Sequence, residues 1–162
     1  MVAKDLMIPL QESLTPEMTL KEAACILRTA KRGEETIGVK GLPVLDPAGT
    51  MVGFLSIGDI LKAVSPSYMG GLMNIGEFSW DGMVEEIARK VCGRRVDAIM
   101  TTAIISVQES APLMVCIDHM VRKGVKRLPV VAADGRVTGI LYERDVFAEI
   151  TANMLGEGRE CR

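Results

Sequence analysis

Residues 53–60 read GFLSIGDI and residues 139–146 read GILYERDV, so a glycine, an apolar pair and an aspartate recur with the same spacing. Each stretch has the apolar residues of a strand followed directly by the start of a helix pattern. In the first copy Ser56 stands three residues before the aspartate, whereas the second copy has Tyr142 at that position. The sequence therefore predicts two similar strand-to-helix corners with unequal chemistry.

These corners belong to a longer internal repeat. Residues 5–27 align without gaps with residues 98–120, and residues 41–60 align with residues 127–146. The offset falls from 93 to 86 between the two blocks, so the first copy carries seven extra residues, close to KRGEETI at 31–37. Similarity over this length indicates that one structural unit is built twice.

Each copy reads as strand, helix, strand, strand and helix. The leading strands are expected at residues 10–14 and 104–107, and the first helix begins with Thr19 and Glu22, which are spaced as a capping box. The motif LPV lies in the second strand of both copies, and a turn signal, DPAG or ADG, separates that strand from the third. A single unit of this size has little core of its own, so two units are expected to bury their sheets together.

The chain organisation follows from the repeat. The segment between the copies contains an amphipathic helix, which is expected to pack on its own repeat. A partner-binding or dimer-forming surface on that helix is the alternative, with Trp80 as its anchor. The expected boundaries are repeat 1 at 1–64, a linker at 65–95 with its helix at about 81–92, repeat 2 at 96–151, and a tail at 152–162.

Composition excludes several classes of protein. The chain has 162 residues, 48% of them hydrophobic and 25% charged, as in a globular domain with an aliphatic core. Its formal net charge of −2 argues against a dedicated nucleic-acid binder. No apolar run could span a bilayer and the first residues lack a signal-peptide pattern, so we expect no membrane insertion and a cytoplasmic protein. The four cysteines form no CxxC pair, which favours reduced thiols.

With the repeat in place, the chain resembles a pair of cystathionine-beta-synthase (CBS) domains, also called a Bateman module. The resemblance rests on DLM and AIMT, on LPVLD and LPVVA, and above all on GFLSIGD and GILYERD. It implies an α+β fold of tandem CBS domains, each β-α-β-β-α, packed sheet to sheet with pseudo-twofold symmetry. Because the repeats fill most of the chain, a stand-alone CBS-pair protein that forms a disc-like homodimer is implied.

The resemblance also implies a regulatory function. Members of the family bind AMP, ADP, ATP or S-adenosylmethionine in clefts between the repeats, in some cases with magnesium. We therefore expect a module that binds an adenosine nucleotide, with Mg²⁺ accompanying ATP, and that changes its own or its dimer's arrangement for an unknown regulated protein. The alternatives are a constitutive dimerisation or protein-interaction module without a physiological nucleotide, and a binder of S-adenosylmethionine.

Two readings apply to Ser56 and Asp59. As a helix cap, Ser56 is the N-cap and Asp59 the third helical residue, which alone explains the pair. The resemblance adds a ligand, for which Asp59 binds the ribose and Ser56 the phosphate or sugar. Basic residues of the second copy are then implied at the phosphate, and adenine at the backbone of two isoleucines. The main cleft comprises Ser56, Asp59, Ile104, Ile105, Lys126, Arg127 and Arg144.

The second cleft is expected to be weaker, altered or empty. It has Asp145, but Tyr142 replaces the serine and can either stack on a base or block the pocket. Lys40 and Gly41 stand where the first cleft has Lys126 and Arg127. The resemblance therefore predicts unequal binding by the two copies.

Catalytic features are not found in the sequence. The one histidine, His119, falls on an apolar helix face and is interpreted as a packed residue. No phosphate loop, nucleophile elbow or zinc motif occurs. We expect neither a catalytic residue, nor a metal site, nor a catalytic cofactor.

Overall fold

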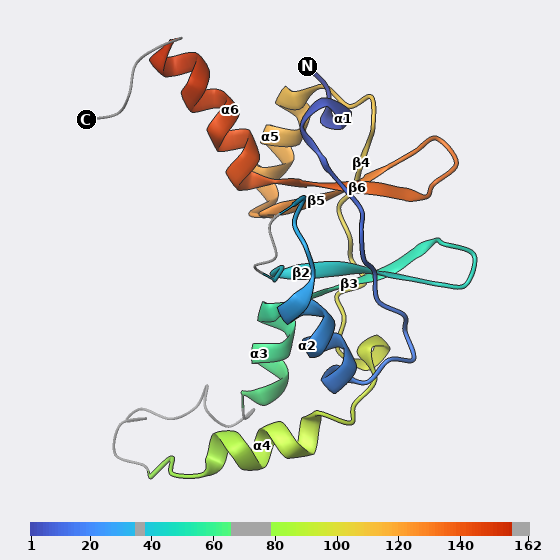
Figure 1. Cartoon of the computed structure of the whole chain (residues 1–162), viewed down its shortest axis with the longest axis vertical. Helices are drawn as coiled ribbons and strands as arrows, with labels where there is room; N and C mark the ends of the chain where they lie inside the picture. The colour runs from blue at the N-terminus through green and yellow to red at the C-terminus, as the bar shows by residue number, and fades with distance from the viewer. Residues whose placement is uncertain (35–37, 66–78, 157–162) are drawn as a thin grey trace. The chain divides into compact units, whose positions relative to one another are not determined.

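The computed structural model describes residues 1–34, 38–65 and 79–156 of the chain (Figure 1). It has mixed helices and sheets, which confirms the α+β class. The helices are α1 (Ala3–Leu6), α2 (Leu20–Thr29), α3 (Ile57–Val64), α4 (Met83–Val91), α5 (Leu113–Lys123) and α6 (Glu143–Leu155), with a 3₁₀ helix at Val96–Ala98. The strands are β1 (Ile8–Pro9), β2 (Gly41–Leu45), β3 (Met51–Ser56), β4 (Val107–Gln108), β5 (Arg127–Val131) and β6 (Val137–Tyr142).

The chain divides into two compact units. Unit 1 consists of Met1–Gln11 and Ile105–Arg162, and unit 2 of Glu12–Ile104. These units do not coincide with the two sequence repeats, because the first residues of repeat 1 fold into unit 1 and the first residues of repeat 2 fold into unit 2. Each unit is thus completed by a segment of the other repeat.

Unit 2 is built on the antiparallel hairpin of β2 and β3, in which Gly41 lies opposite Ser56. The strand expected at residues 10–14 is wrong for most of its length, since only Leu14 pairs, through a parallel bridge to Val44. Residues 8–9 instead form β1 in unit 1, because their backbone pairs with β6. On the other side of the hairpin, Phe54 of β3 bridges to Thr101.

The helices of unit 2 cover its hairpin with aliphatic side chains. Thr19 accepts a hydrogen bond from the Glu22 amide, and the Glu22 carboxylate accepts from the Thr19 amide at 2.8 Å, so the predicted capping box is confirmed. The buried core of the unit is Leu14, Leu20, Ala23, Leu27, Ala30, Val39, Leu42, Val44, Leu55 and Val96.

Unit 1 has a four-stranded sheet in the order β1-β6-β5-β4. Its β4 runs parallel to β5, and the other pairs are antiparallel. The leading strand expected at residues 104–107 begins only at Val107. The buried core of unit 1 is Ala3, Val107, Cys116, Met120, Leu128, Val130, Leu141 and Val146.

The recurring glycine of the two corners has a steric reason in each unit. A Cβ on Gly139 would lie 2.7 Å from the Ile8 carbonyl oxygen and 2.7 Å from the Met7 sulfur. A Cβ on Gly53 would collide with the Met100 side chain. Met7 and Met100 are equivalent residues of the two repeats, and each lies in a segment that joins the unit built mainly from the other repeat. We call each of these a crossing segment, and both glycines make room for it.

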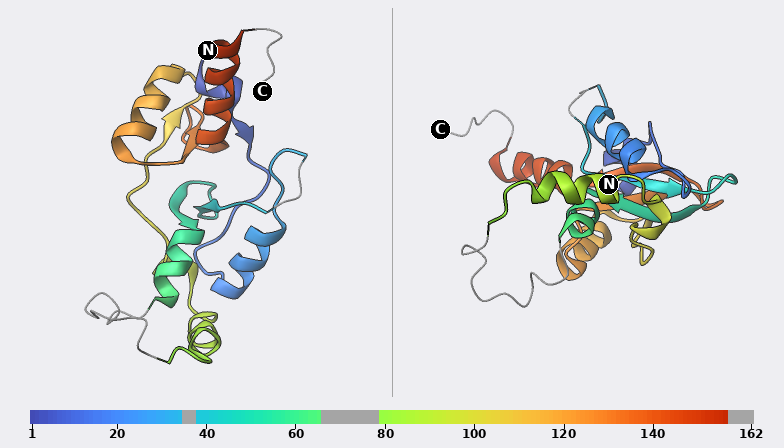
Figure 2. Two further views of the ribbon diagram at one scale, coloured as in Figure 1. Left: turned by 90° about the vertical axis from the view of Figure 1, so that its left-hand side faces the viewer. Right: turned by 90° about the horizontal axis from the view of Figure 1, so that it is seen from below.

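Helix α4 occupies the stretch in which the sequence predicts an amphipathic helix. It contacts α3 within unit 2 (Figure 2), and Val91 packs against the core of that unit. No residue of α4 is buried, and Val84 is 73% exposed. Helix α6 continues to Leu155, past the predicted start of the tail, while residues 35–37 of the insert, 66–78 of the linker and 157–162 of the tail lie outside the described residues.

Candidate functional site

The corner between β3 and α3 holds the first pair of predicted site residues together. The Ser56 amide and the Ser56 hydroxyl each donate to Oδ2 of Asp59 at 2.8 Å. The Asp59 amide donates back to the Ser56 oxygen at 3.3 Å, which completes a capping box. The helix-cap interpretation of these two residues is therefore confirmed, and Asp59 is only 8% exposed.

A third residue contacts this carboxylate from a distant part of the sequence. The Thr101 hydroxyl donates to Oδ1 of Asp59 at 3.0 Å. Thr101 is held there by its backbone, because its amide and carbonyl both pair with Phe54 of β3 at 2.9 Å. Thr101 was not among the residues predicted from the sequence. Its counterpart in repeat 1 is the apolar Ile8, and this difference between the repeats was the available signal.

The free donors at the start of α3 are fewer than the sequence suggests. The Ser56 proton is used by Asp59, the Asp59 amide by Ser56, and the Ile57 amide by the Lys40 carbonyl at 2.9 Å. In the first turn this leaves the Gly58 amide without a partner among the described residues. An anion at this helix start would therefore meet one free N–H group, and further charge must come from side chains.

The corner between β6 and α6 is built on the same backbone with different side chains. Tyr142 is the N-cap of α6 and makes no side-chain cap hydrogen bond. Asp145 is the third helical residue, as Asp59 is in α3, and is partly buried. The two predicted aspartates thus lie at equivalent positions, but the capping box belongs to unit 2.

The predicted phosphate contacts lie in unit 1 at the start of β5. Arg127 pairs across the hairpin with Tyr142, and the Lys126 carbonyl accepts from the Glu143 amide at 3.0 Å. Partial burial lowers the pKa of the Arg127 guanidinium from its ordinary value, while Tyr142 and Glu143 act in the opposite direction. Arginine remains charged at neutral pH, so a partly desolvated cation is available for an anionic ligand.

Arg144 lies in the first turn of α6, directly before Asp145, and its side chain is exposed. A cation at the N-terminus of a helix opposes the helix dipole, so this arginine is not explained by helix stability. Neither Arg144 nor Lys126 forms an ion pair with any residue that the structure describes. Both positive charges are therefore available to a ligand.

The remaining predicted site residues are divided between the units. Ile104 is the last residue of unit 2, and Ile105 packs against the core of unit 1. Lys40 is exposed in unit 2. Its neighbour Gly41 stands where unit 1 has Arg127, and a Cβ there would lie 2.5 Å from the Phe54 ring. Phe54 therefore excludes a side chain at the position that provides a cation in unit 1.

Two side chains that could serve catalysis, those of His119 and Cys116, lie on α5. His119 lies on α5 and is partly buried, as the sequence predicts. Burial raises the pKa of the Cys116 thiol, which is unfavourable for a nucleophile. In the described ranges, no group of three or more His, Cys, Asp or Glu side chains is arranged to hold a metal ion.

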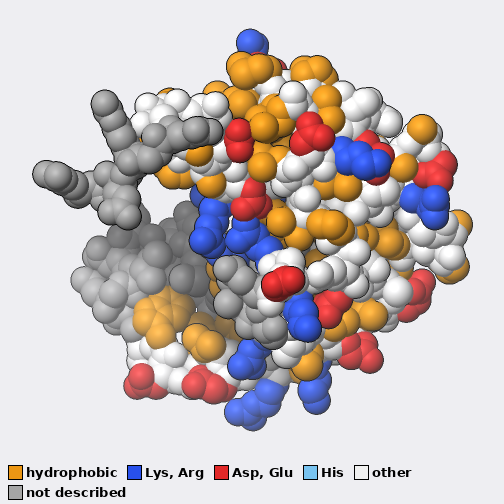
Figure 3. Space-filling view, turned by 45° about the horizontal axis from the view of Figure 1, so that its top comes forward, with side chains coloured by type: hydrophobic (Ala, Val, Ile, Leu, Met, Phe, Trp, Pro, Cys, Tyr) orange, Lys and Arg blue, Asp and Glu red, His pale blue; other side chains and the backbone are white. Residues whose placement is uncertain are grey.

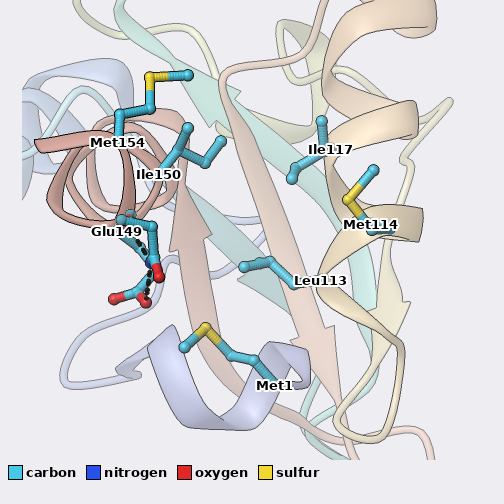
Figure 4. A pocket seen from close by; sticks show the side chains of 8 residues that line it. Met1, Leu113, Met114, Ile117, Glu149, Ile150 and Met154 are labelled. Atoms are coloured by element: carbon cyan, nitrogen blue, oxygen red, sulfur yellow. Dashed lines mark hydrogen bonds between the residues drawn. The ribbon is translucent and has the colours of Figure 1, made fainter. Parts of the chain in front are cut away.

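Each unit also has an apolar hollow between two of its helices. In unit 1 a hollow of about 500 Å³ lies between α5 and α6, with Met1, Met114, Ile117, Ile150 and Met154 around it (Figure 4). In unit 2 a hollow of about 530 Å³ is lined by α2, α3 and Lys40. Hydrophobic side chains reach the surface among charged ones (Figure 3), and Met154 is 76% exposed. None of the helices described in the chain is long and apolar enough to cross a membrane.

Comparison with known proteins agrees with this architecture. The CBS domain family matches residues 3–66 and 96–152. Two curated relatives are the Arabidopsis thaliana CBS domain-containing proteins CBSX1 and CBSX2, both named as chloroplastic. CBSX1 is 28% identical over 141 residues, which cover 80% of this chain and 60% of CBSX1. CBSX2 is 32% identical over 114 residues, which cover 67% of this chain and 48% of CBSX2, so the chain spans less than two thirds of either relative.

Solved structures show the same fold. The crystal structure of CBSX2 in complex with AMP has a TM-score of 0.68 and 26% identity, and the match covers 94% of this chain and 98% of that one. Another crystal structure of CBSX2, described as a CBS-pair protein, has a TM-score of 0.72 over 96% of this chain. Because both repeats are matched in sequence and in structure, this chain belongs to the CBS domain family and contains a tandem pair of CBS domains.

Proposed function

We propose that this chain is a regulatory module that binds an adenosine nucleotide, with AMP as the first ligand to test. The observation that carries the proposal is Asp59, which is the one charged side chain in the buried class among the described residues. Burying a carboxylate is costly unless its oxygens are paired. Those pairings orient Asp59 at the start of a helix, and the similar protein CBSX2 forms a complex with AMP.

Asp59 is assigned to the ribose. Ionised carboxylates accept hydrogen bonds and do not donate them, so sugar hydroxyls are suitable partners whereas phosphate oxygens are not. Ser56 keeps the carboxylate in place and has an oxygen lone pair left for the ligand. The Gly58 amide, which has no partner among the described residues, is available in the same turn for a phosphate oxygen.

Lys126, Arg127 and Arg144 are assigned to the phosphate. Charge-assisted hydrogen bonds from guanidinium groups to phosphate are strong and often bidentate. Arg127 is partly desolvated and Arg144 opposes its own helix dipole, so each of them gains from a bound anion. We assign the adenine to the backbone at Ile104 and Ile105, as the family resemblance implies.

The second site is assigned to Asp145, Tyr142 and Lys40 and is expected to bind more weakly. Unit 2 has Gly41 where unit 1 has Arg127, and Phe54 fills the space beside that glycine. Tyr142 cannot reproduce the serine cap. One strong and one weak binding event per chain therefore follow.

Calorimetry on ligand-stripped protein tests the proposal. AMP, ADP, ATP with Mg²⁺, and S-adenosylmethionine are titrated separately into the full chain, and AMP is expected to bind with one dominant site. Binding of S-adenosylmethionine alone would favour the alternative ligand class. Failure of all four ligands to bind at millimolar concentration would overturn the proposal.

A second candidate function is a constitutive dimerisation module. It is favoured by the apolar hollow between α5 and α6, where Met114 is 71% exposed and Met154 is 76% exposed (Figure 4). Exposed apolar patches of this kind mark interaction surfaces. A second copy of the chain is the proposed occupant in either function, because the resemblance to CBS pairs implies a homodimer.

Sedimentation distinguishes the two functions. Met114→Glu with Met154→Glu places charge on the hollow and is expected to convert dimers to monomers, whereas Val84→Glu tests α4, the alternative dimer surface. A dimer that forms without nucleotide and does not respond to AMP would favour the constitutive module. An unchanged dimer in the Met114 and Met154 variant would exclude this hollow as the interface.

We propose that the chain regulates another protein and does not catalyse a reaction itself. The proposal of a non-catalytic role is supported by the family match, which consists of CBS domains over both repeats. The regulated protein and the cytoplasmic location stay predictions. Mass spectrometry of the small molecules and proteins that co-purify with the chain would identify the bound ligand and the regulated protein.

A further inference from the structure

The exposed methionines of the described residues are gathered in one place. Three methionines belong to the exposed class, Met1 at 62%, Met114 at 71% and Met154 at 76%. All three line the apolar hollow between α5 and α6 of unit 1, and Figure 4 shows their side chains around it. The other described methionines are buried or half-buried: Met7, Met18, Met51, Met83, Met100 and Met120. The thioethers that solvent reaches best therefore surround a single hollow.

Thioether sulfur can change its polarity by oxidation. A sulfur lone pair attacks one oxygen of hydrogen peroxide, the O–O bond breaks, and water is released as the S=O bond forms. The sulfur is oxidised by two electrons, and the peroxide is reduced by the same two. The product, methionine sulfoxide, has a polar acceptor where the thioether was apolar. Oxidation at this hollow would therefore replace part of its apolar surface with polar groups.

We infer that Met114 and Met154 are an oxidation-sensitive pair, at which peroxide converts the hollow into a polar surface that no longer binds a second copy of the chain. The inference rests on the homodimer proposed for this hollow and adds a reversible chemical control to it. Because the dimer covers both side chains, peroxide reaches them in the dissociated chain, and the sulfoxides then prevent reassociation. Two thiols reduce a sulfoxide to the thioether, with formation of a disulfide and release of water, which restores the surface.

The side chains that line the hollow do not compensate for a sulfoxide oxygen. Apart from the methionines they are Leu113, Ile117, Ile150, Glu149 and Asn153. The Asn153 side-chain amide donates to the Glu149 carbonyl at 2.8 Å and to Glu149 Oε1 at 3.0 Å (Figure 4). An ionised carboxylate accepts hydrogen bonds and does not donate them. A covered sulfoxide oxygen would lose its water without gaining a donor from these side chains, which opposes association.

The hollow of unit 2 does not share this chemistry. None of the residues that line the hollow between α2 and α3 is a methionine. Met114 of the second copy aligns with Lys21 of the first, an exposed residue of α2. The predicted sensitivity to oxidation therefore belongs to unit 1.

Sedimentation of the full chain before and after limited treatment with hydrogen peroxide tests the inference. Peptide mass spectrometry is expected to find oxygen on Met114 and Met154 before it finds oxygen on the half-buried Met18 and Met100. The dissociation constant of the dimer is expected to rise about 100-fold, or about tenfold for each of the two unpaired acceptors that a chain would bury. Methionine sulfoxide reductases with a dithiol are expected to restore the dimer.

Met114→Leu with Met154→Leu is the matched control. Leucine keeps the volume and the apolar character of methionine but cannot form a sulfoxide. The variant is expected to dimerise like the wild type and to keep its dimer in peroxide. Both proteins have the exposed Cys25 thiol, so the comparison also controls for cysteine oxidation.

The possible failures are distinguishable. A wild type that keeps its dimer after both methionines are oxidised would overturn the inference and leave the proposed dimer intact. A leucine variant that dissociates in peroxide as the wild type does would assign the response to another residue, and would overturn the inference as well. A wild type that is monomeric before any treatment would overturn the proposed dimer, and this inference with it, without bearing on nucleotide binding.

Discussion

The two units start their helices differently, although they are copies of one repeat. Unit 2 begins both α2 and α3 with capping boxes, whereas the counterparts α5 and α6 in unit 1 have no side-chain cap hydrogen bond. The equivalent N-cap pairs are Thr19 and Pro112, and Ser56 and Tyr142. The starts of α2 and α3 in unit 2 are therefore held by side-chain hydrogen bonds that the starts of α5 and α6 do not have.

This difference separates what the fold requires from what a site requires. Gly53 and Gly139 are retained because a crossing methionine packs over each of them. Ser56 and Tyr142 can differ because both are N-cap residues with an extended backbone, so the corner forms with either side chain. The corner geometry is thus common to both units, and the side chains decide which corner can bind a ligand.

The largest expected effect is on ligand affinity when the two aspartates are compared. Asp59→Ala is expected to lower AMP affinity about 10-fold to 150-fold, because a hydrogen bond to a charged group is worth about 1.5–3 kcal/mol. Asp145→Ala is expected to change it less than threefold, since Tyr142 makes no side-chain cap hydrogen bond and Ile8 stands in place of Thr101. Calorimetry with AMP measures both.

The fold of these variants needs its own control. Asp59→Ala also removes the cap of α3, which costs about 1 kcal/mol of stability, so circular dichroism and urea unfolding accompany the titration. Ser56→Ala removes the same cap and keeps the carboxylate. Equal affinity losses in the two aspartate variants would refute unequal sites.

The next effect is on stability and compares the two glycines. Gly139→Ala is expected to cost about 1–3 kcal/mol, because its Cβ would meet the Ile8 carbonyl oxygen, which the β1–β6 pairing holds in place. Gly53→Ala is expected to cost less, because the atoms it meets belong to the flexible Met100 side chain. Urea unfolding measures the difference, and a larger cost at Gly53 would contradict it.

The charge asymmetry of the units predicts an effect of about tenfold on affinity. Lys126→Gln with Arg127→Gln is expected to weaken AMP binding about tenfold and leave adenosine within about twofold, because the lost contacts are to phosphate. Arg122→Gln with Lys123→Gln, at the exposed end of α5, is the matched control. An identical loss for adenosine would withdraw the assignment of Lys126 and Arg127 to phosphate.

The repeat was enough to predict most of the fold. Its alternating strands, its turn signals and the capping box at Thr19 all reappear in the structure. The leading strands were placed only in part, because Leu14 and β4 pair within their own repeats whereas the residues before them pair with the other repeat. Residues 8–9 pair with β6, and Thr101 pairs with Phe54. A sequence pattern indicates that a segment is extended, but not which sheet edge it joins.

The candidate site was predicted in part for a related reason. Ser56 and Asp59 are three residues apart, so their contact could be predicted from spacing. Thr101 is 42 residues from Asp59 in the sequence. It comes close to Asp59 because its backbone pairs with Phe54 of β3, three residues before the start of α3. A sign of it was present in the sequence, since aligning the repeats places Thr101 over Ile8, a polar residue over an apolar one.

The smallest effect concerns the other capping box and its dependence on pH. Hydrogen bonds from the Thr19 amide and hydroxyl lower the pKa of Glu22 below its ordinary value of 4.5. A carboxylate with a lowered pKa stabilises the fold fully above the unfolded pKa, and this contribution is lost as the pH falls through the folded value.

Glu22→Gln isolates this contribution. The variant is expected to be slightly less stable than the wild type near neutral pH, and the difference in urea midpoint is expected to vanish as the pH falls well below 4.5. Glu85→Gln, on the exposed face of α4, controls for the loss of one negative charge. Because the α5 counterpart of Glu22 is Val115, this acid-sensitive cap belongs to unit 2. A difference that stays constant with pH would show that the Glu22 carboxylate does not stabilise α2 through its charge.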